Sequence, residues 1–116
     1  MLSITPACRI WLCTQPTDMR RSFDGLSALV RNHLAADPTS GDWFVFINRR
    51  RTQIKVLAFE SGGYALWSKR LEMGRFAALG QADEAKRMLS QTALQALLEG
   101  VDIVVKRQRK RYQRAA

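Results

Sequence analysis

Apolar residues in the N-terminal third of the chain predict a strand followed by a helix. Residues 9–13, RIWLC, form a short apolar run typical of a strand. After a break at residues 16–18, apolar side chains recur at steps of three and four, which indicates an amphipathic helix ending near residue 37. These positions are Met19, Phe23, Leu26, Val30 and Leu34. Gly25 costs a helix about 1 kcal/mol relative to alanine, so we expect a close contact there.

Three further runs predict strands over residues 43–48, 52–60 and 64–71. The first is apolar on both faces, which indicates a central position in the sheet. The second and third runs meet across Ser61-Gly62-Gly63, a typical hairpin turn signal. These two runs also carry apolar residues on both faces. We therefore expect both faces of the sheet to be covered, by helices or by a partner subunit.

The C-terminal third predicts a short helix over residues 92–99, with Thr92 and Gln95 as a capping box and Gly100 beyond its end. Residues 77–91 are compatible with a backward extension of this helix or with a loop and a short strand around residues 88–89. The pattern as a whole predicts an α+β fold in a single domain over residues 1–105. In that fold, a mostly antiparallel sheet of four or five strands packs with one long N-terminal helix and one short C-terminal helix. Four residues are expected in the core: Phe23, Leu26, Leu97 and Leu98.

Length and composition agree with one compact domain, since 47% of the 116 residues are hydrophobic. No run approaches the roughly 18 to 20 apolar residues of a membrane span, and the first residues lack the features of a signal peptide. We therefore predict a cytoplasmic protein without membrane contact. Cys8 and Cys13 are an odd number of positions apart in a predicted strand, so their side chains should lie on opposite faces.

The net charge of +9 is concentrated at the C-terminus. Residues 106–116, called the tail below, contain six cations and no acid. They are Lys106, Arg107, Arg109, Lys110, Arg111 and Arg114. A block of like charge is expected to stay flexible and to attract a polyanion, with nucleic acid as the first candidate. A tail that only improves solubility would have the same composition.

Catalytic chemistry has little support in the sequence. The single histidine, His33, rules out a two-histidine metal site and is more typical of a structural residue. Four carboxylates fall near predicted caps and strand ends, where they suit capping and charge pairing: Asp18, Asp24, Glu60 and Glu72. We therefore predict a protein with no catalytic residues, no metal site and no cofactor.

Cations gather around the predicted hairpins. A two-residue loop at Gly62-Gly63 would place Lys55 opposite Arg70, and a three-residue loop would place it opposite Lys69. Directly opposed cations are destabilising unless an acid or a bound anion lies between them, which favours phosphate binding. Alternatively, nearby acids neutralise these cations, or their stems cover apolar surface. The candidate nucleic-acid-binding residues outside the tail are Arg49, Arg50, Arg51, Lys55, Lys69, Arg70 and Arg75.

Four motifs, in this order and spacing, carry a family resemblance. They are TDMRRSFDGLSALV (17–30), FVFINRRRTQIKVLAFE (44–60), LWSKRLEMGRF (66–76) and LLEGVD (97–102). Over roughly residues 4–103 the sequence resembles the TnpB-type accessory protein of the IS-sixty-six family of bacterial insertion sequences, the product of the second reading frame. The resemblance implies a small protein encoded beside a separate transposase, needed for efficient transposition and without established catalytic residues.

The function expected on these grounds is that of a non-enzymatic accessory factor in DNA transposition. In the leading mechanism, the hairpin cations and the tail bind DNA phosphates. In the alternative, the chain is an adaptor that docks the transposase or another accessory subunit without touching DNA. The sequence leaves open whether the target is DNA or RNA, whether bases are recognised, and whether the chain forms an oligomer.

Overall fold

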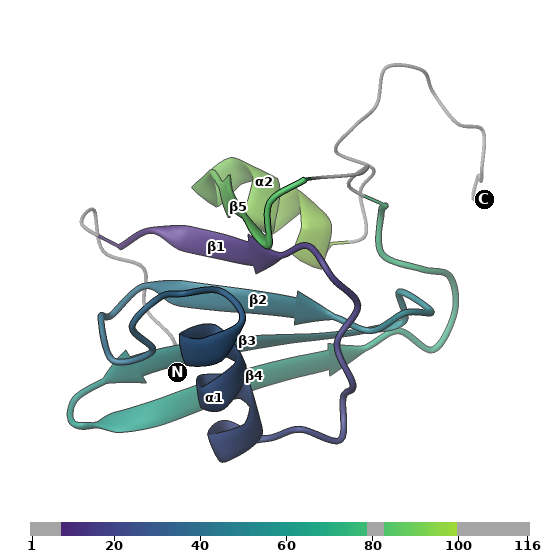
Figure 1. Cartoon of the computed structure of the whole chain (residues 1–116). Coiled ribbons are helices and arrows are strands. Elements are labelled where there is room, and N and C mark those ends of the chain that lie inside the picture. The colour runs from purple at the N-terminus through teal and green to yellow at the C-terminus, as the bar shows by residue number, and fades with distance from the viewer. Residues whose placement is uncertain (1–7, 79–82, 100–116) are drawn as a thin grey trace.

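A five-stranded sheet with a helix against each face forms the body of the protein in the computed structural model, which describes residues 8–78 and 83–99 (Figure 1). The strands are β1 (Ile10–Cys13), β2 (Trp43–Ile47), β3 (Gln53–Glu60), β4 (Gly63–Arg70) and β5 (Lys86–Leu89), and the helices are α1 (Phe23–Asn32) and α2 (Gln91–Leu98). The strand order is β4-β3-β2-β1-β5, so β2 is central, as its apolar run predicts. The α+β class and the number of strands are confirmed.

The sheet is mixed, and the prediction of a mostly antiparallel sheet is corrected in this respect. β1 pairs with β2 in parallel, whereas the other neighbouring strands pair antiparallel. Parallel neighbours need a crossover connection, and α1 supplies it between the end of β1 and the start of β2. Both of these strands therefore finish at the same end of the sheet.

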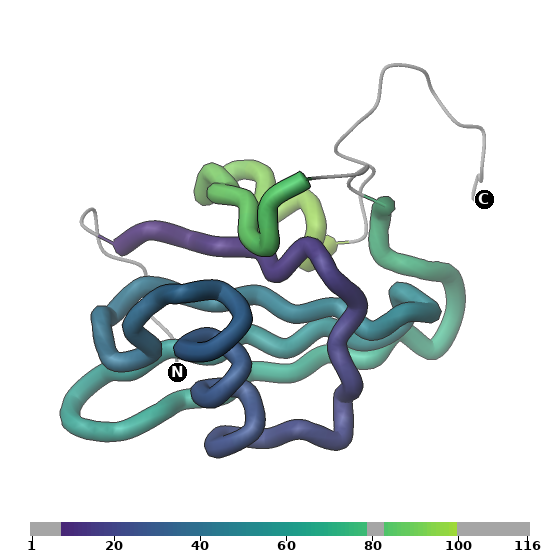
Figure 2. Tube along the Cα trace, in the orientation of Figure 1, coloured from purple at the N-terminus to yellow at the C-terminus, as the bar shows by residue number. Residues whose placement is uncertain are grey.

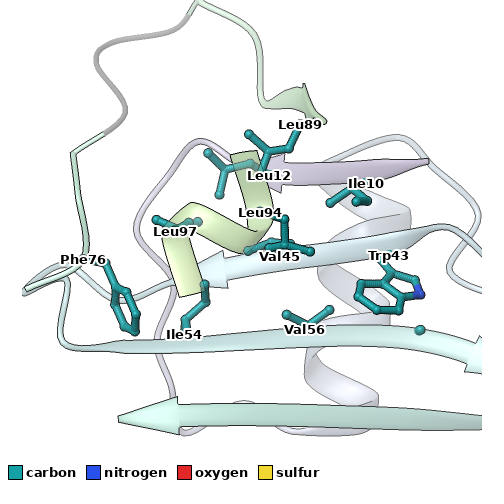
Figure 3. Close-up of a cluster of buried hydrophobic side chains, with 11 residues drawn as sticks. Ile10, Leu12, Trp43, Val45, Ile54, Val56, Phe76, Leu89, Leu94 and Leu97 are labelled. Carbon is teal, nitrogen blue, oxygen red and sulfur yellow. The ribbon is translucent and has the colours of Figure 1, made fainter. Parts of the chain in front are cut away.

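Alternating side chains of the strands divide the core into two clusters, one on each face. On the α2 face, Leu94 and Leu97 of α2 pack over Val45 and Ile54 of the sheet (Figure 3). On the α1 face, Leu26 and Val30 join a cluster whose sheet residues include Phe44, Phe46 and Leu57. Cys13 belongs to the α1-face cluster, while Cys8 packs against the α2-face cluster, which confirms that the two cysteines lie on opposite faces.

The N-terminal helix is shorter than predicted, because two apolar residues of the periodic pattern lie outside it. Met19 and Leu34 pack against the α1-face cluster, but α1 covers only the ten residues Phe23–Asn32. The backbone turns at Ala35, whose φ of 52° is left-handed. The close contact expected at Gly25 is confirmed, since a Cβ atom there would lie 3.1 Å from Cβ of Arg21.

The structure of residues 83–99 decides between the two alternatives that the sequence allowed for residues 77–91. β5 confirms a short strand around residues 88–89, with Met88 and Leu89 paired to β1. The predicted capping box is wrong, because Ser90 caps α2: its hydroxyl accepts a hydrogen bond of 2.9 Å from the amide of Ala93. Gly100 lies outside the described residues.

A membrane-spanning helix must be long and apolar, and the described residues contain no such helix.

The hairpin between β3 and β4 has a different register from either predicted one. Ser61 and Gly62, with φ values of 52° and 81°, form the two-residue loop, and Gly63 begins β4 opposite Glu60. Two left-handed residues suit the tight loop that joins twisted antiparallel strands. Lys55 consequently lies opposite Ser68 and faces neither Lys69 nor Arg70. The predicted stacking of like charges is therefore wrong.

One of the predicted core residues is exposed. Leu26 and Leu97 are fully buried and Leu98 is half-buried, but the side chain of Phe23 is 45% exposed. Phe23 stands three residues before Leu26 and so lies on the stripe of α1 that faces the sheet. Its exposure shows that the sheet does not extend beneath the start of α1.

Candidate nucleic-acid interface

One end of the sheet gathers arginines from four separate segments. β1, β2 and β4 end there, while β3 and β5 begin there, because the pairing registers align these termini. We call this the basic end and define it by Arg49, Arg50, Arg51, Arg70, Arg75 and Arg87. The opposite end includes Asp42 and Glu60, beside the starts of β2 and β4. Arginines therefore predominate at the basic end, although Glu72 lies there beside Arg70 and Arg9 lies beside Asp42 at the opposite end.

A hollow of about 190 Å³ opens at the basic end, between the ends of β1 and β2. Its charged lining consists of Arg49, Arg51 and Arg87, and its apolar lining includes Leu12 and Ile47. Thr14, Gln15 and Asn48 add polar side chains to the wall. No acidic residue is among the residues of the described chain that line it. The other lining residues are apolar, so the three arginines make the hollow more suited to an anion than to a cation.

The turn between β2 and β3 is held by Asn48. Its carboxamide oxygen accepts hydrogen bonds from the amides of Thr52 and Gln53, at 2.9 and 3.0 Å. The amide of Arg51 donates to the backbone oxygen of Asn48 at 3.0 Å, and Arg51 has a φ of 58°. This network fixes the backbone on which the exposed side chains of Arg49 and Arg50 stand. The arginines are thus presented by an ordered turn.

Arg51 also connects this turn to the segment after β4. Its backbone oxygen accepts a hydrogen bond of 2.7 Å from the amide of Phe76, and its guanidinium donates to the backbone oxygen of Phe76 at 3.4 Å. Phe76 itself is fully buried in the α2-face cluster. Figures 1 and 2 show this segment running beside the turn. Arg75 is thereby held next to the arginines of the turn.

Two predicted cations make structural contacts instead of lying free at the surface. Nζ of Lys55 donates to the backbone oxygens of Met19 and Arg21, each at 2.9 Å, just before α1. On the other face, Nζ of Lys69 donates to the backbone oxygen of Leu98 at 2.7 Å, where α2 ends. A cation near helix C-terminal carbonyls is stabilising. These contacts assign both lysines to holding helices against the sheet.

The remaining predicted cations differ in their contacts. Arg70 forms an ion pair of 3.2 Å with Glu72, and both side chains are largely exposed. Within residues 8–78 and 83–99, the side chains of Arg49, Arg50 and Arg75 make no hydrogen bond or ion pair. The six predicted cations of the tail lie outside the described residues. Arg49, Arg50 and Arg75 are therefore the predicted cations best placed to meet an external anion.

Replacing Lys55 by methionine is expected to lower the free energy of unfolding by about 1–3 kcal/mol, because the carbonyls of Met19 and Arg21 lose their donor. Urea unfolding measures this loss. Arg50→Ala is the control, since that exposed side chain should change stability by no more than about 0.5 kcal/mol. Equal losses in the two variants would show that the lysine contacts do not stabilise the fold.

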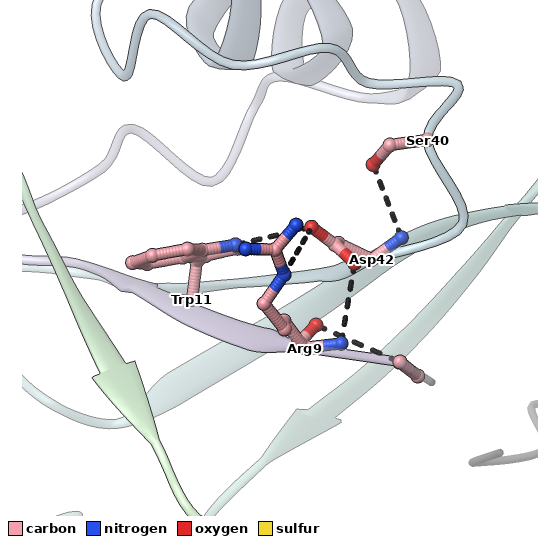
Figure 4. Close-up of polar contacts among 5 residues, drawn as sticks. Arg9, Trp11, Ser40 and Asp42 are labelled. Atoms are coloured by element: carbon pink, nitrogen blue, oxygen red, sulfur yellow. Dashed lines mark hydrogen bonds and ion pairs between the residues drawn. The ribbon is translucent and has the colours of Figure 1, made fainter. Parts of the chain in front are cut away.

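The end of the sheet opposite the basic end holds a polar cluster with a structural role (Figure 4). The carboxylate of Asp42, only 15% exposed, accepts hydrogen bonds of 3.2 Å from the amide of Arg9 and from Nε1 of Trp11. Farther along β1, toward the basic end, Nζ of Lys86 lies 5.1 Å from the centre of a Trp11 ring and donates to the backbone oxygen of Leu34 at 2.9 Å. These contacts tie the loop before β2 to β1 and β5.

The carboxylates of the described residues are dispersed. The carboxylate of Asp18 accepts side-chain hydrogen bonds from Arg20, at 2.6 Å from Nη2 and at 3.0 and 3.1 Å from Nε, and they hold its pKa well below the usual range. In residues 8–78 and 83–99, no three His, Cys, Asp or Glu side chains are grouped so that they could hold a metal ion. His33 is exposed at the C-cap of α1.

Comparison with known proteins places the chain in a family. Residues 8–108 match the profile of the family described as IS66 Orf2 like protein. The chain belongs to the IS66 Orf2-like family. Two proteins of Sinorhizobium fredii are similar to it: y4jC, 37% identical over 88% of this chain and 86% of its own length, and y4hO, 36% identical over 81% of each. Both are named only as uncharacterized proteins, and no solved structure matches.

Membership of the IS66 Orf2-like family confirms the resemblance found in the sequence motifs and implies an accessory role in transposition. The sequence did not indicate Arg87 as a residue of the basic end. Arg87 lies within residues 77–91, for which the sequence allowed a helix or a strand, and it reaches the hollow because it pairs opposite Leu12. The possible short strand around residues 88–89 was the feature of the sequence that could have placed Arg87 in the sheet.

Proposed function

We propose that this IS66 Orf2-like chain is a non-enzymatic accessory factor in DNA transposition that binds backbone phosphates through its basic end. The observation that carries the proposal is the placement of Arg49, Arg50 and Arg75. They are exposed, their side chains make no hydrogen bond or ion pair within the described chain, and they stand beside a hollow without an acidic lining. The family supports the transposition context.

The chemistry of arginine suits this role. A guanidinium presents a planar fork of donors that matches two oxygens of one phosphate. Arg49 and Arg50 would meet phosphates outside the turn, while Arg51 and Arg87 would add positive charge inside the hollow. Contacts of this kind fix the position of a protein on nucleic acid without recognising sequence.

The ordered backbone of the turn reduces the cost of binding. Asn48 already fixes the turn through hydrogen bonds to Thr52 and Gln53, so little backbone freedom is lost when a phosphate binds. Phe76 holds Arg75 nearby in the same way. The tail cations would add further non-specific attraction to any polyanion. The basic end would then position nucleic acid that the tail helps to attract.

Amide chemical-shift mapping by NMR on the full chain tests this proposal. Addition of duplex DNA at low salt should shift the amides of residues 48–52, 75 and 87, because an anion bound nearby changes their electrostatic environment. The amides of Arg9 and Asp42, at the opposite end, serve as internal controls and should shift much less. Shifts confined to the tail, or centred on the control residues, would contradict a role for the basic end.

The same titration with single-stranded DNA and with RNA compares how the chain binds these classes of nucleic acid.

The alternative function, an adaptor for the transposase, predicts a different outcome. The basic end would then be unaffected by any of these nucleic acids and would respond to the purified transposase. A result of that kind would assign the arginines to a protein interface.

A further inference from the structure

β4 forms a long edge of the described sheet. It spans the eight residues Gly63–Arg70 and, among residues 8–78 and 83–99, pairs only with β3, at one end of the strand order. The amide of Leu71 donates to the backbone oxygen of Thr52 at 2.8 Å, which fixes the phase of the ladder. Odd-numbered residues of β4 therefore direct their backbone groups to β3. The backbone groups directed outward belong to Tyr64, Leu66, Ser68 and Arg70.

Large apolar side chains remain exposed on both faces beside this edge. Trp67, on the α2 face of β4, is 36% exposed. On the other face, Phe23 lies on the sheet-facing stripe of α1 and is 45% exposed. The helix α1 contacts this strand, and Figure 1 shows them close together. A further strand beyond β4 would extend the sheet beneath both side chains.

We propose that this strand is β4 of a second copy of the chain, paired antiparallel around a two-fold axis at Trp67. The β4 edge is self-complementary in this register. Each Leu66 lies opposite Ser68 of the second copy, and each Tyr64 lies opposite Arg70 of the second copy, so the outward backbone groups of all four residues find partners. The two Trp67 side chains face each other in a non-hydrogen-bonded pair, where side chains approach most closely.

Charge and ladder length favour this arrangement over two other pairings of β4 strands. Parallel pairing in register would place Lys69 and Arg70 beside their own copies, which is destabilising. In the proposed register, Lys69 lies opposite Ala65, and Arg70 lies opposite the ring of Tyr64, which attracts a cation. An antiparallel pairing centred on Leu66 would instead leave Arg70 opposite the turn residue Gly62 and lose part of the ladder.

The other edge of the sheet is less suited to pairing, because β5 has only four residues. Pairing through β4 does not depend on the proposed binding of nucleic acid, since the basic end is formed by other segments together with the last residue of β4. The two-fold axis would direct the two basic ends toward opposite sides of the joined sheet. One dimer could then contact two separate stretches of nucleic acid.

Disulfide trapping tests the register in the full chain. A Trp67→Cys variant should form a covalent dimer on mild oxidation, because the paired Cα atoms would be within the roughly 4.4–6.8 Å that a disulfide spans. Ala65→Cys is the matched control on the same face of the same strand and should form much less, since its own copy would be several residues away. The unaltered chain shows any background from Cys8 and Cys13. Equal trapping at residues 65 and 67, or none at 67, would overturn the register.

Sedimentation analysis without oxidation supplies an independent measurement. The unaltered chain should sediment as a dimer. Trp67→Glu should raise the dimer dissociation constant at least about tenfold, because two carboxylates would meet on the axis. Circular dichroism verifies that this variant is folded. A folded, unaltered chain that stays monomeric at all concentrations would overturn the proposal, whatever its affinity for nucleic acid.

Discussion

Replacing Leu97 by alanine is expected to lower the free energy of unfolding by about 2–5 kcal/mol. Leu97 is fully buried in the α2-face cluster, where it meets side chains of the sheet and of the segment after β4. An eight-residue helix such as α2 is not stable in water by itself, so its position depends on Leu94 and Leu97. A loss of this size is a large fraction of the about 5–15 kcal/mol that stabilises a typical domain.

Thr92→Ala is the matched control for this prediction. Thr92 is exposed on the same helix, and Ser90 provides the cap, so its loss should change stability by no more than about 0.5 kcal/mol. Denaturant unfolding of the full-length variants measures both effects. A loss below about 1 kcal/mol for Leu97→Ala would contradict the packing of α2 on the sheet.

Local patterns in the sequence predicted the strands well. The apolar runs placed β2, β3 and β4 within about one residue of their observed bounds and marked β2 as central. This success has a physical basis, because alternation and burial are properties of neighbouring residues. The hairpin was located but shifted by one residue, since Gly62 and Gly63 both suit a left-handed turn and only the folded register shows that Ser61 and Gly62 form it.

The long-range features could not be predicted in the same way. The periodic apolar positions extended the first helix to Met19 and Leu34, because periodicity reports which side chains reach the core and not where helical hydrogen bonds end. The parallel pairing of β1 with β2 depends on how α1 packs as a crossover. These features arise from contacts between segments that are distant in the sequence.

The candidate site was predicted in part. The sequence indicated the arginines of the turn and Arg75, but it also included Lys55 and Lys69, whose long side chains reach backbone oxygens before α1 and at the end of α2. Such contacts cannot be distinguished from surface exposure in a sequence. Arg87 was missed because its register with β1 is a property of the sheet.

Removing the turn arginines is expected to reduce the salt dependence of DNA binding. Each phosphate contact on duplex DNA contributes roughly 0.9 to the slope of log affinity against log salt, because bound cations displace counterions. The Arg49→Ala/Arg50→Ala variant should therefore flatten the slope by about two units if each arginine meets one phosphate.

Deleting residues 106–116 should flatten the slope by several units and lower the affinity for all DNA sequences about equally, since the tail carries six cations.

A control variant with the same loss of charge separates contact from net charge. Arg9 lies beside Asp42 at the end opposite the basic end, and Arg31 lies in the last turn of α1. The Arg9→Ala/Arg31→Ala variant loses as many charges as the turn variant, but both residues are away from the proposed contact. Its slope should remain close to that of the unaltered chain.

The measurement that tests the central claim most directly is this salt series with the full chain, the turn variant and the control variant side by side on one duplex. Binding through the basic end predicts a slope about two units flatter for Arg49→Ala/Arg50→Ala and a nearly unchanged slope for Arg9→Ala/Arg31→Ala. Equal slopes for the two variants would contradict it, because the turn arginines would then contribute no more than any other surface charge.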